Sequence, residues 1–393
     1  MAQVSALIVG GGIGGITAAL ALAKRGCRAA VFEQSTEFQN VGAGIQLSPN
    51  CTRVLHHLGL QQALRDCAFV PEGTQFRHWK TGRVIAESRL GDQALGRYGY
   101  PYYHVHRRDL MDILRKAASA SSLIDWVDGA SVTDFSESDT SLDLVVNRKD
   151  FSADVLIGAD GIHSNVRERL FGSDAPTFTG NVAWRTLVPV ERLDAGAVPP
   201  VASVWWGPGK HFVHYYVRGG DLVNCVCVVE KNGWETEAWT AKGSVDELQN
   251  DFAGWHEDIQ HLIENVDADS LYKWALHDRA PLTHWSKGRV SLLGDACHPT
   301  LPFMAQGAAM AIEDGAVLAD CLAFGSDPAA SLAKYETLRK PRTATVQAAS
   351  RRNARLFHLS GIGAWLRDRG AAYATDRVMD SLFRYDALSA VER

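Results

Sequence analysis

The chain has 393 residues, 46% of them hydrophobic, and a formal net charge of −5 at pH 7. This length and apolar content predict a large core, arranged as two structural units around a shared interior. The acidic balance provides no basic surface for a polynucleotide, so we expect no nucleic-acid partner. No apolar run approaches the roughly 20 residues of a membrane-spanning helix, so we expect no membrane association.

Seven cysteines are scattered along the chain, which begins with a core strand rather than a leader. This usage is typical of a reducing environment and predicts a cytoplasmic protein. Cys225 and Cys227 would face the same side of one strand, and no matching Cys or His pair follows at zinc spacing. We therefore interpret them as core residues and expect no metal site.

The apolar run over residues 6–9 predicts a buried parallel strand that ends at Gly10-x-Gly12-x-x-Gly15 and leads into a helix over residues 13–25. Gly10 permits the tight turn, Gly12 lets the backbone approach a pyrophosphate, and Gly15 lets helix and strand pack closely. The first-turn N–H groups of the helix would then point at anionic oxygens. This pattern predicts an ADP-containing dinucleotide without choosing between FAD and NAD.

A second apolar run over residues 29–32 ends at Glu33, where the dinucleotide fold places the carboxylate that binds ribose hydroxyls. Gly44 belongs to a glycine-rich segment whose backbone would lie close to a ligand or to another part of the chain. Gln46 alternates with apolar neighbours and would line a cavity or lie on an exposed strand. At a predicted helix start, Arg107 or Arg108 would reach a phosphate, or both would stay solvated charges.

Two later strand–turn–helix segments return the chain to the sheet. The run over residues 153–157 leads to a turn at Asp160, where a second ligand contact is expected. The run over residues 289–293 leads to Asp295, which would accept hydrogen bonds from ribityl hydroxyls. A helix rich in small residues begins near Ala305, and the partial positive charge at its N-terminus would suit an anionic reduced flavin ring.

Between residues 176 and 274 helical patterning thins and alternating segments appear, which predicts a mainly antiparallel sheet over one side of a pocket. A period of two places His211 and Tyr215 on one face of a strand and His214 on the other. An imidazole, a phenol and apolar bulk on one face would suit a small aromatic phenol. The alternative is a sheet whose His and Tyr side chains are satisfied within the core.

Three of these motifs together are more specific than any one alone. The opening glycine motif with Glu33, residues 158–167 and residues 294–299 resemble the group A flavoprotein aromatic hydroxylases typified by p-hydroxybenzoate hydroxylase, over about residues 3–355. The resemblance implies an α/β fold. It would have a Rossmann-like FAD-binding domain with a parallel sheet and an α+β substrate domain with a mainly antiparallel sheet.

The expected domains are each built from separate segments. They are an FAD-binding domain of residues 1–72, 104–175 and 281–360, a substrate domain of residues 73–103 and 176–280, and a C-terminal helical segment of residues 361–393.

Residues 41–45, the His106-Arg107 pair and residues 302–307 are most similar to the branch with salicylate hydroxylases, 3-hydroxybenzoate 6-hydroxylase and 6-hydroxynicotinate 3-monooxygenase. The resemblance implies FAD as cofactor and NADH or NADPH as a transient co-substrate, in whose handling Asp160, Gly161 and Arg167 would take part. The expected cofactor-binding residues are Gly12, Gly15, Glu33, Gly44, Arg107, Asp160, Asp295, Gln306 and Gly307.

The resemblance also implies a single-component monooxygenase, monomeric or homodimeric, that uses O₂ to hydroxylate a small aromatic acid through a flavin C4a-hydroperoxide. His211 is the candidate base because imidazole titrates near working pH, and Tyr215 would hydrogen-bond the ring substituents. His214 is the rival base if the strand register shifts by one. A flavin oxidase or reductase and a non-catalytic FAD-binding protein are the alternatives.

The expected substrate site combines His211 and Tyr215 with Gln46, Pro302 and Phe303. Some members of the branch carry histidine at the position of Phe303 or glutamine at that of Pro302. The 6-hydroxynicotinate enzymes carry histidine at the position of Gln46. These departures leave a salicylate-like substrate as the expectation, with 3-hydroxybenzoate and 6-hydroxynicotinate as alternatives.

Overall fold

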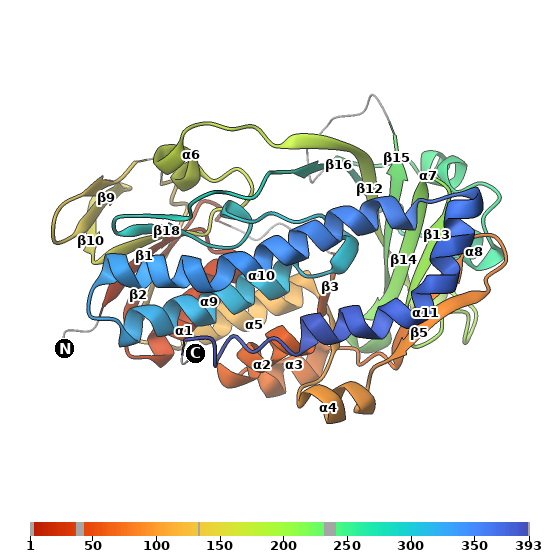
Figure 1. Cartoon of the computed structure of the whole chain (residues 1–393), viewed down its shortest axis with the longest axis horizontal. Helices are drawn as coiled ribbons and strands as arrows, with labels where there is room; N and C mark the ends of the chain where they lie inside the picture. Colours follow the sequence, from red (N-terminus) through yellow and green to blue (C-terminus); the bar gives the residue numbers. More distant parts are fainter. Residues whose placement is uncertain (1–3, 37–42, 133, 232–240, 392–393) are drawn as a thin grey trace.

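The computed structural model describes residues 4–36, 43–132, 134–231 and 241–391, in which two large sheets are joined by long helices (Figure 1). The first sheet is parallel except for its edge strand β17. Its strands, in order across the sheet, are β17 (Ser286–Lys287), β18 (Val290–Leu292), β11 (Val155–Gly158), β1 (Ser5–Val9), β2 (Arg28–Glu33) and β7 (Ile124–Asp128).

The central strands of this sheet are short apolar runs with buried side chains, as expected for a parallel sheet whose faces are covered. The helix predicted over residues 13–25 is α1 (Ile13–Lys24), and it packs against α9 (Gly307–Phe324) and α5 (Arg107–Ser119). An unbroken run from Ala309 to Leu322 is buried in α9, so this helix passes through the interior. The long helices of this region are α1 (Ile13–Lys24), α5 (Arg107–Ser119), α9 (Gly307–Phe324) and α10 (Pro328–Phe357).

The second sheet is antiparallel except between β13 and β4, which confirms the mainly antiparallel prediction. Its strands, in order, are β16 (Tyr272–Asp278), β12 (Thr177–Pro189), β15 (Leu222–Glu230), β14 (Lys210–Val217), β13 (Val201–Gly207), β4 (Gly73–His78) and β5 (Val84–Arg89).

The two faces of the second sheet have different coverings. One face buries Trp184, Trp205 and Phe212 in a core shared with α7 (Val245–Asp251) and α8 (Glu257–Glu264). The opposite face looks towards the end of α10 and towards α11 (Gly361–Phe383), which runs past β5 (Figure 1). Only this second face borders the cavity described below.

A two-stranded sheet of β3 (Gly44–Leu47) and β6 (Tyr103–His106) contacts both regions, since β3 contacts α9 and β6 contacts β14. Val41 and Gly42 of the glycine-rich segment lie outside the described residues. The boundaries of the expected domains stay a prediction, although β4 and β5 do lie in one sheet with β12 to β16.

The remaining elements are β8 (Ser136–Glu137), β9 (Leu142–Val146), β10 (Lys149–Ala153), α2 (Pro49–His57), α3 (Gln61–Cys67), α4 (Asp92–Tyr98) and α6 (Asn165–Phe171).

Candidate active site

The turn after β1 uses its glycines for different purposes. Gly10 has a φ of +106°, in a region that side chains disfavour, and a Cβ on Gly15 would lie 2.0 Å from the Gly10 carbonyl oxygen. A Cβ on Gly12 would meet no protein atom within 4 Å. Gly12 is also the N-cap of α1, without a side-chain cap. The first-turn N–H groups of α1 therefore face open space in which an anion is favoured.

Glu33 ends β2 beside this turn. Its Oε2 accepts the N–H of Gly11 at 2.8 Å, and its Oε1 accepts the N–H of Ser35 at 2.9 Å. An ionised carboxylate has about four acceptor positions, so Glu33 retains capacity for hydroxyl groups. The backbone thus orients this carboxylate next to the anion-binding turn, as a ribose would require.

Arg107 and Asp295 bring opposite charges to one cavity. Arg107 begins α5 and Asp295 follows β18, and both side chains are accessible from the cavity. Burial lowers the pKa of Arg107 and raises that of Asp295, while each charge opposes the shift of the other. The pair offers a cation to a phosphate and an acceptor to hydroxyl groups.

Gln306 and Gly307 lie at the N-terminus of α9, where they reach the same cavity. Gln306 Nε2 donates to Ser48 Oγ at 3.0 Å, and its Oε1 accepts from Asn50 Nδ2 at 3.1 Å. These bonds fix the side chain at the start of α9. The uncapped helix end contributes partial positive charge to the cavity.

The cavity has a volume of about 880 Å³ and lies between the glycine turn, the second sheet and α11. Such a volume is in the range of small-molecule and cofactor sites. Gly15, Glu33 and Asp160 are not part of its wall. The predicted site residues that do line it are Gly12, Gly44, Gln46, Arg107, His211, Tyr215, Asp295, Pro302, Phe303, Gln306 and Gly307.

The alternation predicted for β14 is confirmed. His211, Val213 and Tyr215 line the cavity, whereas His214 points to the opposite core, where its Nε2 accepts the indole N–H of Trp205 at 3.0 Å. Burial, with a smaller effect of Arg77, lowers the pKa of His214 to about 3. The position of His214 therefore does not support the rival assignment, and the catalytic role of His211 stays a prediction.

Gly44 lets another segment of the chain approach closely. This is one of the two environments expected for the glycine-rich segment. A Cβ on Gly44 would lie 2.7 Å from Tyr215 Cε2, and its N–H donates to Asn224 Oδ1 at 2.6 Å. Gln46, two residues later, accepts the hydroxyl hydrogen of Tyr102 at 2.6 Å and borders the cavity. The N-terminal part of β3 thus contacts β14 and β15 and presents Gln46 to the cavity.

The family of this chain follows from its similarity to known proteins. A family model described as "FAD binding domain" matches residues 3–350. The chain is 38% identical to 3-amino-4-hydroxybenzoate 2-monooxygenase PtnB3 of Streptomyces platensis, over 96% of this chain and 94% of the relative. It is also 38% identical to 6-hydroxynicotinate 3-monooxygenase of Pseudomonas fluorescens, over 88% and 90%. The chain belongs to the FAD-dependent aromatic monooxygenases.

The similarity to solved structures supports the same family assignment. A salicylate hydroxylase substrate complex superposes with a TM-score of 0.84 at 27% identity, covering 99% of this chain and 97% of that one. The expected family, branch and α/β fold are therefore confirmed, as are FAD as the cofactor and NAD(P)H use in the family. The open cradle at Gly12, the oriented Glu33 carboxylate and the Arg107–Asp295 pair are chemically suited to FAD.

Asp160 is one of the predicted cofactor residues of this monooxygenase that do not line the cavity. Its Oδ1 accepts from Ser164 Oγ at 2.5 Å and its Oδ2 accepts the N–H of Val166 at 3.2 Å, so it binds the first turn of α6. Arg167 points to the backbone oxygens of Ile162 and Ala296. Their roles towards FAD and NAD(P)H stay predictions, since Gly161 alone of the three lines the cavity.

A buried ionic network that the sequence patterns did not predict lies under the Asp295 loop of the monooxygenase. Arg339, which is fully buried, lies 2.7 Å from both Glu313 Oε2 and Asp314 Oδ1. Asp314 Oδ2 lies 2.5 Å from His298 Nε2 and accepts the N–H of Gly294 at 3.1 Å. The two adjacent acids inside a mostly apolar helix were the available signal, because buried charges need partners.

Arg185 on β12 is a second residue that sequence analysis missed. It lines the cavity, and its guanidinium stacks 4.5 Å from the ring centroid of Trp274. Burial lowers its pKa to about 10, opposed by Tyr215 and assisted by the like charge of Arg107. The enzyme therefore holds a second desolvated cation beside the predicted substrate residues.

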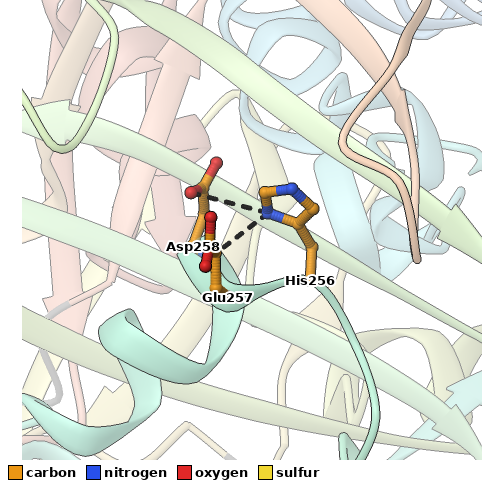
Figure 2. Close-up of side chains that lie close together, drawn as sticks. All are labelled: His256, Glu257 and Asp258. Carbon is orange, nitrogen blue, oxygen red and sulfur yellow. Dashed lines mark hydrogen bonds and ion pairs between the residues drawn. The ribbon is translucent and has the colours of Figure 1, made fainter.

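Among the described residues, a potential metal-ligating group is formed by His256, Glu257 and Asp258 at the start of α8 (Figure 2). His256 is the N-cap of this helix, and its Nδ1 accepts the N–H of Asp258 at 3.3 Å. Capping thus explains the arrangement without an ion. None of the helices in the described ranges has the length and apolar character needed to cross a bilayer.

Proposed function

We propose that this monooxygenase hydroxylates a small aromatic carboxylate whose phenolic hydroxyl and carboxylate lie at opposite ends of the ring. The observation that carries this proposal is the spacing of His211 and Tyr215, which share one face of β14 with Val213 between them. Four residues of a strand span about 13 Å at roughly 3.3 Å per residue. His211 and Tyr215 are polar side chains at the two ends of an apolar part of the cavity wall. This arrangement suits a para-substituted ring better than an ortho-substituted one.

The charges support the same orientation. Arg185 acts electrostatically on Tyr215, so an anionic carboxylate is favoured at the Tyr215 end of the cavity. Burial raises the pKa of the Tyr215 phenol, which keeps this group a hydrogen-bond donor. The names of the two relatives above also describe rings with the hydroxyl across from the carboxylate, 3-amino-4-hydroxybenzoate and 6-hydroxynicotinate.

His211 would act as the base at the other end. Burial and the neighbouring His358 hold the pKa of His211 well below its ordinary value, so the imidazole is neutral at pH 7 and has one ring nitrogen without a proton, while the imidazolium form is disfavoured. Its Nδ1 already lies 2.9 Å from His358 Nε2, which leaves Nε2 for the phenolic hydroxyl. Removing that proton makes the ring more electron-rich and prepares it for electrophilic oxygen.

The rest of the wall would orient the ring and exclude water. Phe303 packs 5.0 Å from the His211 ring, and Trp206, Phe76 and Val213 add apolar surface. Bound FAD, reduced by NAD(P)H, supplies the activated oxygen. An apolar cavity wall that excludes water would protect the activated oxygen from reaction with water. Gln46 and Pro302, which also border the cavity, complete the proposed substrate site.

A salicylate-like substrate is the second candidate, supported by the similarity to the salicylate hydroxylase complex. One assay separates the candidates. FAD-loaded enzyme is given NADH or NADPH with 3-amino-4-hydroxybenzoate, 6-hydroxynicotinate, 3-hydroxybenzoate or salicylate, and the product is identified by mass. Stimulated consumption and oxygen insertion only with the first two support our proposal, whereas salicylate as the best substrate contradicts it. Peroxide without an oxygenated product would indicate an oxidase.

A further inference from the structure

Behind His211, two more side chains continue away from the cavity. His211 Nδ1 lies 2.9 Å from His358 Nε2, and His358 Nδ1 lies 2.9 Å from Glu230 Oε1. Both histidines are buried, while the Glu230 side chain is 57% exposed. The three side chains form a hydrogen-bonded path from the cavity wall to solvent.

We propose that the chain His211–His358–Glu230 carries the phenolic proton of the substrate out of the cavity, with Glu230 as the terminal acceptor. This inference rests on the proposed function, in which His211 accepts that proton. His358 and Glu230 are then positioning residues that act through His211 and do not touch the substrate.

The backbone fixes the outer part of the path. Gly209, in the turn between β13 and β14, donates its N–H to the His358 carbonyl oxygen at 3.0 Å. Its own carbonyl oxygen accepts the N–H of Glu230 at 2.9 Å. Because one turn residue binds both partners, His358 and Glu230 are held in register with each other and with β14.

The proton steps balance without any change of oxidation state. The substrate O–H bond breaks as an N–H bond forms at His211 Nε2. The Nδ1 proton of His211 passes to His358 Nε2, and the Nδ1 proton of His358 passes to Glu230, which releases a proton to water. Both imidazoles end neutral with the proton on the other nitrogen. Reprotonation of the product hydroxyl along the same path restores the starting tautomers.

The surroundings of His211 and His358 favour passing a proton on to Glu230 over holding it on either imidazole. Burial lowers the pKa of His358, Glu230 raises it, and Arg367 of α11 lowers it. His211 faces His358 and the rings of Phe303 and Phe357. A proton is thus disfavoured on either buried imidazole, whereas the exposed Glu230 carboxylate can pass it to water.

The decisive variant is Glu230→Gln, because an amide oxygen still accepts a hydrogen bond from His358 but takes up no proton. FAD-loaded enzyme is mixed in a stopped-flow instrument with whichever of the four ring compounds above stimulates NAD(P)H consumption. Proton release is followed with an indicator dye in weak buffer. We expect release at least tenfold slower in Glu230→Gln, with an unchanged dissociation constant for the ring compound. High imidazole buffer should restore the rate, since the position is exposed.

Glu191→Gln, at an exposed glutamate outside the path, is the matched control and should release the proton at the wild-type rate. His358→Gln should show the same slowing as Glu230→Gln, in protein that retains FAD. Wild-type rates of release in Glu230→Gln would overturn the relay while leaving the proposed function intact. A wild-type enzyme that hydroxylates none of the four rings would overturn both.

Discussion

His298 and Asp314 form a fully buried pair, with His298 Nε2 2.5 Å from Asp314 Oδ2. Asp314 also binds Arg339 and the Gly294 N–H, so one carboxylate connects α9, α10 and the loop that presents Asp295. Burial alone would raise the pKa of Asp314, yet His298 and Arg339 outweigh it and hold the pKa below its ordinary value. This carboxylate therefore supports the loop that presents Asp295 to the cavity.

Asp314→Asn should lower the free energy of unfolding by about 3–5 kcal/mol, because it leaves the buried Arg339 charge without one of its two carboxylates. It should also weaken FAD retention through the Gly294–Asp295 loop. Thermal unfolding with and without added FAD measures both effects. Asp327→Asn, at the N-cap of α10, is the control that changes a carboxylate outside this network. Equal losses in the two variants would contradict the special role of Asp314.

Gly12→Ala and Gly15→Ala should separate cofactor binding from folding. Gly12 has a φ of −74° and free space at its Cβ position, so the apoprotein should tolerate alanine while FAD affinity falls at least tenfold. Alanine at Gly15 would contact the Gly10 carbonyl oxygen and should destabilise the apoprotein itself. Apoprotein melting and FAD titration by flavin fluorescence measure the two effects. A Gly12→Ala variant with wild-type FAD affinity would contradict this placement of the cofactor.

His211→Ala should leave FAD bound, as judged by visible absorption, and slow hydroxylation by about 10²–10⁴-fold, the usual range for general-base assistance. Single-turnover product formation is the measurement. His214→Gln changes the imidazole on the opposite face of β14 and should retain the rate of hydroxylation. If His211→Ala hydroxylates at the wild-type rate, His211 is not the base.

The buried neutral histidines should make stability pH-dependent. The pKa of His214 is about 3 in the folded protein and about 6.5 when unfolded, so the unfolded state binds the extra proton between these values. Stability therefore rises with pH in this window, by about 1.4 kcal/mol per pH unit for this one residue. Denaturant unfolding at pH 4.5, 5.5 and 6.5 should show this slope reduced by that amount in His214→Gln. An unchanged slope would mean that His214 is protonated in the folded protein.

Arg185→Gln should raise the dissociation constant of the substrate about 10–100-fold, because a hydrogen bond to a charged group contributes about 1.5–3 kcal/mol. The carboxamide analogue of the same ring should bind both forms similarly. Titration of FAD-loaded enzyme with the acid and with its amide distinguishes loss of charge recognition from a general loss of fold. Equal weakening for both ligands would contradict a carboxylate at this end of the cavity.

Local sequence patterns determined much of this protein. The glycine spacing predicted β1, α1 and the turn between them, and the period of two placed His211 and Tyr215 on the cavity face of β14. Such features follow from backbone geometry over a few residues, which the sequence of one segment specifies. The family motifs then identified FAD and the class of reaction.

Only the tertiary structure decided which distant residues meet. His358 follows α10 and hydrogen-bonds both His211 of β14 and Glu230 at the end of β15, and Arg185 reaches the same cavity from β12. The hydrogen bonds of Asp160 to the start of α6 likewise became visible only in the folded chain, and its expected role towards FAD stays a prediction. The reason is physical: hydrogen-bond partners and charge compensation depend on packing between segments far apart in the chain, and local periodicity contains no information about that packing.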